Sequence, residues 1–201
     1  MKRIFDFIAS LVGLVLLSPF ILILSSFLLI FNGWPVFFIQ PRLGKDKIPF
    51  NMIKFRTMKK GNSKSSEDDA IRQTRFGKIL RKTSLDELPV LINVVKGNMS
   101  LVGPRPLLLK YKNRFTNFQD SRHNVIPGIT GLAQIKGRNE ISWEKKFEYD
   151  IQYIEQRSFL LDLRILFRTI FSVLLLKNTS PSNQDIMPEF MGTDNERKKP
   201  A

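Results

Sequence analysis

The chain has 201 residues, of which 43% are hydrophobic, so it can bury one modest core but hardly two. It has no cysteine and a single histidine, His123, which excludes disulfide frameworks, thiolate metal clusters and sites built from several histidines. Its formal charge of +14 would attract nucleic acid, anionic lipid or a phosphate-bearing substrate alike, or simply keep the surface soluble. Because cysteine is missing and histidine is single, any chemistry must rest on carboxylates, Lys and Arg.

A run without charged residues, Phe7 to Phe31, predicts a membrane helix near the N-terminus. The run is longer than the apolar region of a signal peptide and lacks a small-residue cleavage site, so we expect it to be retained. As a straight helix it would extend roughly 37 Å, enough to cross a hydrocarbon core of about 30 Å. An ordinary membrane span is therefore one interpretation.

The dipeptide Ser18-Pro19 at the middle of this run favours a bend instead, because proline removes a backbone hydrogen bond and clashes with the preceding turn. Both flanks are also basic, with Lys2 and Arg3 before the run and further Lys and Arg residues between positions 42 and 56. Symmetric flanks fit a re-entrant helix that enters and leaves by the cytoplasmic face. The physics of the sequence leaves both topologies open, since proline also occurs in true spans.

The residues after the anchor predict a small mixed domain that begins with a β-hairpin. Val36 to Gln40 and Phe50 to Phe55 are rich in β-branched and aromatic residues typical of strands, and Pro41 to Asp46 is rich in turn residues. The polar stretch Gly61 to Asp69 predicts a surface loop whose acidic residues are solvated rather than metal-binding.

The apolar segment Phe159 to Lys177 carries basic residues at near-helical spacing, which predicts either a buried helix or one lying in the membrane interface. Given the anchor, we favour the interface. His123 lies in a polar run and is expected to be exposed or capping rather than catalytic. Residues 178–201 are polar and basic, which predicts a partly ordered tail.

Two adjacent carboxylates, Asp86 and Glu87, lie in a segment dense in Lys and Arg. Ser84-Leu85-Asp86-Glu87 matches a capping box ahead of the apolar run Leu88 to Val95, which Gly97 would end. Taken alone, this pattern favours Glu87 as an ordinary helix cap.

A helix cap explains neither Asp86 nor the triplet Pro104-Arg105-Pro106, in which two prolines stiffen the backbone around a guanidinium suited to phosphate. A carboxylate that attacks phosphorus needs cations to neutralise the phosphate oxygens and a second carboxylate to activate the next nucleophile. Mg²⁺ suits such a site, because it is commonly held by one or two carboxylates and substrate phosphates.

Several motifs in fixed order carry a resemblance to a known family: KRIFD at 2–6, Ser18-Pro19, KFRTM at 54–58, SLDELP at 84–89, NVVKGNMSLVGPRP at 93–106, PGITGLAQ at 127–134 and GRNEISWEKKFEYD at 137–150. Over residues 2–176 the chain resembles the monotopic phosphoglycosyl transferases, in particular their small members. These are bacterial sugar transferases that start glycan assembly on polyprenyl phosphate.

The resemblance implies an α+β, mostly helical fold. It would comprise a re-entrant membrane helix over residues 1–33, a catalytic domain with interfacial helices and a β-hairpin over 34–177, and a tail over 178–201. It also implies a ping-pong reaction in which Asp86 attacks the β-phosphate of a UDP-sugar and UMP leaves. Asp86 would help to hold Mg²⁺, and Glu87 would assist polyprenyl phosphate in the second attack. The phosphate-binding positions would be Lys54, Arg81 and Arg105.

The expected partners are a UDP-sugar, with an N-acetylated hexose as the leading candidate, undecaprenyl phosphate and membrane phospholipids. Downstream glycosyltransferases are further candidates, and no nucleic acid is expected. The expected location is the cytoplasmic face of the bacterial inner membrane. Two alternatives stay open: a membrane-tethered, non-enzymatic binder of anionic lipid or nucleic acid, and a phosphotransferase that uses Asp86 and Glu87 as general base without a covalent step.

Overall fold

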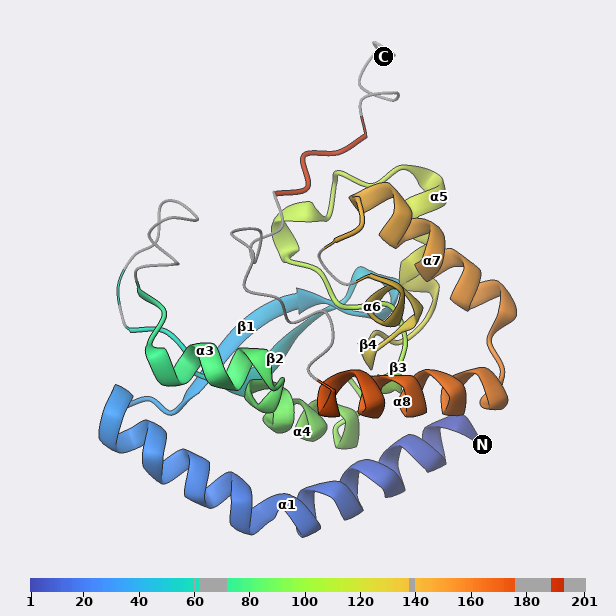
Figure 1. Cartoon of the computed structure of the whole chain (residues 1–201). Coiled ribbons are helices and arrows are strands. Elements are labelled where there is room, and N and C mark those ends of the chain that lie inside the picture. The colour runs from blue at the N-terminus through green and yellow to red at the C-terminus, as the bar shows by residue number, and fades with distance from the viewer. Residues whose placement is uncertain (60, 62–71, 138–139, 176–188, 194–201) are drawn as a thin grey trace. The chain divides into compact units, whose positions relative to one another are not determined.

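The computed structural model describes residues 1–59, 61, 72–137, 140–175 and 189–193 (Figure 1). The helices are α1 (Lys2–Asn32), α3 (Arg75–Lys82), α4 (Leu91–Val95), α5 (Asn117–Asp120), α6 (Leu132–Lys136), α7 (Trp143–Gln156) and α8 (Phe159–Leu174). The short 3₁₀ helices are η1 (Lys45–Lys47), η2 (Leu85–Val90), η3 (Leu109–Tyr111) and η4 (Ser121–Asn124). The strands are β1 (Phe37–Leu43), β2 (Pro49–Phe55), β3 (Ser100–Val102) and β4 (Gly128–Thr130). The predicted α+β, mostly helical fold is confirmed.

The described residues fall into two compact units. The first lies within Met1–Gln40, Asn51–Gly97 and Phe171–Ser180, and the second lies within Pro41–Phe50, Asn98–Ile170 and Pro181–Ala201. Each unit has its own buried apolar clusters, so the expectation of a single core is wrong. Each unit is described by itself below. The predicted loop lies outside the described residues from position 62 to 69, as does most of the predicted tail.

Helix α1 is, in the described part of the chain, the one helix long and apolar enough to cross a membrane. It continues through Pro19, and Figure 1 shows it as a bowed helix rather than two separate ones. In an α-helix the amide at position 19 would donate to the carbonyl of Val15, but proline has no N–H to donate. The hydroxyl of Ser18 donates to that carbonyl instead, at 2.7 Å. Pro19 thus leaves the carbonyl of Val15 without an amide donor, and the hydroxyl of Ser18 supplies a donor in its place.

The C-terminal arm of α1 belongs to the core of the first unit. Leu24 and Leu28 are buried there together with Phe55 of β2 and Leu80 of α3. Leu85 and Leu88 of η2 pack against the same cluster. Helix α1, the hairpin and the segment that holds the two adjacent carboxylates therefore share one apolar core.

The hairpin of β1 and β2 is confirmed, although its turn comes later than predicted. Pro41 belongs to β1, and the turn is closed by the amide of Gly44 donating to the carbonyl of Ile48 at 2.9 Å. The turn signal of Pro41 was misleading, because proline is tolerated in an edge strand and a two-stranded sheet has only edges.

In the second unit β3 and β4 pair in parallel, with Ser100 opposite Gly128 and Val102 opposite Thr130. A Cβ atom on Gly128 would lie 2.0 Å from the amide nitrogen of Gly103, so only glycine permits this close approach. Around the strands, a core forms from buried residues of several elements: Val102, Leu132, Tyr153 and Ile165.

Helix α8 confirms the helix predicted from Phe159 onward, but it is neither fully buried nor fully exposed. Ile165 and Asp162 are buried, and the hydroxyl of Tyr153 donates to Asp162 at 2.7 Å. Large apolar side chains on its other side are exposed, including Leu160 and Phe167. One side of α8 thus packs in the protein, and an apolar side remains for the predicted membrane interface.

Candidate active site

The two adjacent carboxylates lie on η2, between α3 and α4. Leu85 and Leu88 are one 3₁₀ turn apart and both pack toward the core, which leaves Asp86 and Glu87 between them. Ser84 takes a left-handed conformation with φ 59°, and its side chain makes no capping hydrogen bond. The predicted capping box is therefore wrong, because Ser84 does not adopt the extended conformation that such a cap requires.

Glu87 instead contacts a lysine from the hairpin. The Nζ atom of Lys54, near the end of β2, lies 2.6 Å from Oε1 of Glu87, and both side chains are largely buried. Asp86 next to it is also buried. The structure therefore brings together three of the predicted site residues in the first unit.

A buried asparagine sets the position of Lys54. The side-chain oxygen of Asn93 on α4 accepts from the amide of Ile53 at 3.0 Å, and its nitrogen donates to the carbonyl of Asn51 at 2.7 Å. The amide side chain thereby pairs with β2 as a neighbouring strand would. Sequence reasoning missed Asn93, since only its placement beside β2 distinguishes it from a surface asparagine.

Arg81 lies on α3, which is fixed to the end of β2. Thr74 caps α3 by accepting from the amide of Gly77 at 2.9 Å, and the amide of Thr74 donates to the carbonyl of Thr57 at 3.2 Å. The Nε atom of Arg81 donates to the hydroxyl of Thr57 at 2.9 Å. The predicted phosphate-binding side chain is exposed and tethered at Nε, so its other nitrogens can meet a ligand.

The first turn of α1 also reaches this region. The guanidinium of Arg3 donates to the carbonyls of Val94 at 2.8 Å and Val95 at 3.3 Å, which are the last carbonyls of α4. A cation at a helix C-terminus is favourable. Gly97 follows with φ 91° and ends the helix as predicted. The basic first turn of α1 thus stabilises α4, the helix that follows the two carboxylates.

The donor set of the site fits Mg²⁺ in one respect. Among the described residues no group of three or more His, Cys, Asp or Glu side chains could form a metal cage. Asp86 and Glu87 offer the small number of carboxylates that Mg²⁺ uses when water and substrate phosphates complete its coordination.

Arg105 belongs to the second unit. Its carbonyl accepts from Arg122 at 2.7 Å, and the Arg122 guanidinium forms a buried ion pair with Asp150. Burial raises the pKa of the Asp150 carboxyl, and the charge of Arg122 acts in the opposite direction. Burial and the positive charge of Arg105 lower the pKa of Lys146, also in this unit, to about 8.

His123 is buried in η4, so of the two expectations, exposure and capping, exposure is wrong. Its Nδ1 atom lies 3.0 Å from the carbonyl of Asp120, and its ring lies edge-on to Phe115. Burial and, second, the positive charge of Arg122 lower the pKa of His123 to about 4. The polar run around His123 did not predict this burial, because residues elsewhere in the sequence cover the ring.

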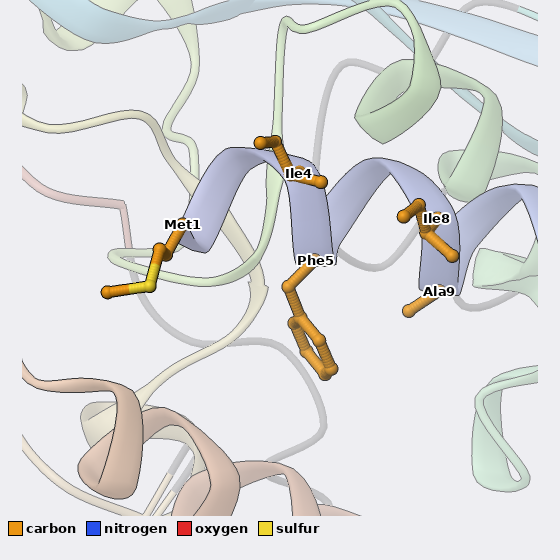
Figure 2. Close-up of a pocket in the computed structure, with 5 residues that line it drawn as sticks. All are labelled: Met1, Ile4, Phe5, Ile8 and Ala9. Carbon is orange, nitrogen blue, oxygen red and sulfur yellow. The ribbon is translucent and has the colours of Figure 1, made fainter.

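A hollow of about 350 Å³ lies beside the first turns of α1. Figure 2 shows its lining, with Phe5 and Ala9 pointing the same way from the helix. The lining residues are Met1, Ile4, Phe5, Ile8 and Ala9. An apolar lining without Lys, Arg or carboxylate does not suit phosphate chemistry.

The sequence that carries these elements matches a known family. The family model described as bacterial sugar transferase covers residues 1–176. The chain belongs to the bacterial sugar transferase family. The predicted enzyme class, a phosphoglycosyl transferase, is thereby confirmed, and the elements described above form a sugar transferase domain.

The sequence of this sugar transferase is also similar to those of several named proteins. It is 46% identical to the uncharacterized sugar transferase EpsL of Bacillus subtilis, covering 96% of each chain. It is 41% identical to the UDP-glucose:undecaprenyl-phosphate glucose-1-phosphate transferase of Klebsiella pneumoniae, covering 88% of this chain and 41% of that protein. It is 37% identical to the UDP-N-acetylgalactosamine-undecaprenyl-phosphate N-acetylgalactosaminephosphotransferase of Aeromonas hydrophila, covering 86% of this chain and 43% of that protein. The chain thus spans about two-fifths of the length of the latter two relatives.

Proposed function

We propose that this sugar transferase moves a sugar-1-phosphate from a UDP-sugar to undecaprenyl phosphate and releases UMP. The observation that carries the proposal is the contact of Lys54 with Glu87 beside the buried Asp86. The names of the relatives support the substrate class, since both longer relatives are named for a UDP-sugar and undecaprenyl phosphate. The product would begin a polysaccharide or other glycoconjugate.

The reaction proceeds in two displacements at one phosphorus atom. A carboxylate oxygen of Asp86 attacks the β-phosphorus of the UDP-sugar, and the bond to the bridging oxygen breaks so that UMP leaves with the electron pair. An oxygen of undecaprenyl phosphate then attacks the aspartyl phosphosugar, and the carboxylate of Asp86 is released. Glu87 takes the proton of the attacking phosphate where it carries one.

The cations around this pair have separate roles in the proposal. Lys54, for which the resemblance implies a phosphate contact, holds Glu87 in one orientation. Arg81 and Arg105 bind phosphate oxygens of the nucleotide sugar. Asp86 would help to hold Mg²⁺, which would neutralise charge on the phosphate oxygens and so ease the attack by a carboxylate.

The proposed location is the cytoplasmic face of the bacterial inner membrane, with α1 re-entrant at Ser18-Pro19. The bowed course of α1 and the Ser18 hydrogen bond to the freed carbonyl support this topology. The chain has no cysteine, so Lys2→Cys and Lys59→Cys can each serve as a single labelling site. In spheroplasts a membrane-impermeant maleimide should label neither residue before permeabilisation and both after it. Labelling of only one residue in intact spheroplasts would establish a spanning helix.

The decisive assay is UMP release from a panel of UDP-sugars with Mg²⁺, with and without undecaprenyl phosphate. The panel includes glucose, galactose and their N-acetylated forms, because the relatives are named for both kinds of sugar and an N-acetylated hexose is the proposed substrate. Wild-type protein should release UMP with the carrier and pass the labelled sugar phosphate to lipid. Silence across the panel, with intact binding of anionic lipid or nucleic acid, would favour the non-enzymatic tethered binder.

The covalent step needs a separate experiment without carrier. Wild type should release no more than one equivalent of UMP and retain the labelled sugar on the protein, whereas Asp86→Asn should retain none. Glu87→Gln should acquire the label and pass it on slowly. A carrier-dependent reaction with no labelled protein under any condition would support direct transfer with Asp86 and Glu87 as general base.

A further inference from the structure

The backbone of Pro104-Arg105-Pro106 is held through all three of its carbonyl oxygens. The carbonyl of Pro104 accepts from the amide of Gly128 at 3.0 Å, and that of Arg105 accepts from Nη2 of Arg122 at 2.7 Å. The carbonyl of Pro106 accepts from Nη1 of Arg42 at 3.2 Å. The two prolines fix their own φ angles and have no N–H, so their carbonyls are their remaining backbone hydrogen-bonding groups.

The guanidinium of Arg122 is itself fixed on two sides. Its Nε and Nη2 atoms lie 3.0 and 2.7 Å from the same carboxylate oxygen of Asp150, and the two side chains are only 3% and 4% exposed. Its Cζ atom lies 5.6 Å from the ring centre of Phe147. Nη2 therefore bridges the carboxylate and the carbonyl of Arg105, and this geometry leaves the donor little freedom to move away.

Stability alone does not account for this buried pair. Two charges removed from water lose their hydration, and an apolar pair of similar volume often stabilises a core equally well or better. What an apolar pair lacks is a donor for the carbonyl of Arg105. The charged pair is thus suited to holding one stretch of backbone in one conformation.

The charge of the side chain that this backbone carries acts on a second cation, Lys146. Lys146 is on α7, one turn before Asp150, and the positive charge of Arg105 is the second cause, after burial, that lowers the pKa of Lys146. Like charges repel, and the Asp150 carboxylate acts on the pKa of Lys146 in the opposite direction.

We propose that Arg122 is a positioning residue that, with Asp150 and Arg42, clamps Pro104-Arg105-Pro106 so that the Arg105 guanidinium is held ready for a phosphate oxygen of the nucleotide diphosphate. The inference rests on the proposed function, in which Arg105 binds the nucleotide sugar. A clamped backbone lowers the entropy lost on binding, because the residue that carries the charge is ordered beforehand. Arg122 and Arg42 need not touch the substrate.

The test compares Arg122→Lys with Arg105→Ala and with both changes together. Lysine keeps a charge for Asp150 but is a single ammonium that does not reproduce the fork of the guanidinium. We expect Arg122→Lys to lower kcat/KM for the UDP-sugar about tenfold or more, as misplacement of a substrate-positioning group does. The double variant should be no worse than Arg105→Ala, because the effect of Arg122 passes through Arg105.

The matched control is Arg114→Lys in the same unit. Arg114 also donates to a backbone carbonyl, that of Phe190 at 2.6 Å, and pairs with a carboxylate, Glu189 at 2.7 Å. It is not bonded to the triplet in any described contact, so its replacement should leave kcat/KM within about twofold, as for sites without shared partners. If Arg122→Lys does not fold, Arg42→Lys tests the clamp at Pro106 in the same cycle.

The affinity for UDP alone, measured by calorimetry, separates this inference from the proposed reaction. If the wild type binds UDP but transfers no sugar, the proposed reaction is wrong. The clamp is still supported if Arg122→Lys weakens UDP binding in the wild-type background but not in the Arg105→Ala background. Additive losses in the double variant, or full UDP affinity in Arg122→Lys, would overturn the clamp. So would an active wild type whose Arg105→Ala variant is unchanged, or a wild type that does not bind UDP.

Discussion

The Nζ atom of Lys54 lies 2.6 Å from Oε1 of Glu87, with the two side chains only 17% and 16% exposed. Thirty-three positions separate them in sequence, and the Asn93 amide that holds β2 against α4 brings them together. Removing one partner of such a buried pair leaves the other charged and uncompensated. The contact therefore fixes the orientation of Glu87 beside Asp86.

Replacement of Lys54 tests this relationship. Lys54→Met should lower kcat for UMP release roughly 100-fold, because a misoriented acid–base group loses a factor of that size. Lys54→Arg should retain part of the activity, since the cation is kept. The control is Lys78→Met on the exposed side of α3, which should leave kcat unchanged. Equal kcat for Lys54→Met and wild type would remove Lys54 from the site.

Gly77 tests the docking of α3. A Cβ atom at this position would lie 2.0 Å from the carbonyl oxygen of Thr57, so Gly77→Ala should push α3 from the end of β2 and cost roughly 1–3 kcal/mol or more. At Gly13 the added Cβ would lie an ordinary 3.6 Å from Leu91. Thermal unfolding in detergent should show a lower Tm for Gly77→Ala and little change for Gly13→Ala. Similar Tm values for the two variants would contradict this packing.

His123 predicts a pH dependence of stability. Its pKa is about 4 when folded and 6.5 at its ordinary value, so between these values the unfolded chain binds more protons than the folded one. The free energy of unfolding should therefore rise with pH through this window, by at most about 1.4 kcal/mol per pH unit. His123→Gln should flatten the slope when unfolding is followed by denaturant titration from pH 4 to 7. A slope unchanged by the substitution would assign it to other groups.

Phe190 tests how the carboxyl-terminal part of the described chain is held. Its ring is buried against four aromatic rings, those of Tyr111, Phe115, Trp143 and Phe147. Phe190→Ala should therefore cost about 3–5 kcal/mol. Met191→Ala is the control, because Met191 is 55% exposed and should change the Tm little. Limited proteolysis after residue 188 should become faster only in the Phe190 variant.

Hydrogen bonds from Lys110 and Arg114 hold the pKa of Glu189 below its ordinary value. Because the pKa of Glu189 is lowered in the folded state, its ionised carboxylate contributes to stability above the ordinary glutamate range. That contribution is lost as pH falls through the folded pKa. Protection of residues 189–193 from proteolysis should therefore weaken at acidic pH, and Glu189→Gln should remove that pH dependence. Retained dependence in Glu189→Gln would point to another carboxylate.

Local patterns in the sequence predicted several elements because each depends on neighbours along the chain. The apolar run of α1, the strands of the hairpin and the end of α4 at Gly97 are of this kind. Composition also misled where long-range packing intervened. The motif at Ser84 predicts a helix cap, but Ser84 takes φ 59° and makes no capping hydrogen bond. The polar run around His123 predicts an exposed or capping side chain, but the ring is buried.

By itself, the sequence determined the family, the membrane helix with its Ser18-Pro19 pair, and the adjacency of Asp86 and Glu87, since all of these are properties of residue order. Only the tertiary structure decided that Glu87 meets Lys54, that Asn93 acts as a strand partner, and that Arg122 and Arg42 hold the carbonyls around Arg105. These contacts join residues far apart in sequence. Their geometry follows from how β-strands and helices pack around apolar cores, which no local pattern of residues specifies.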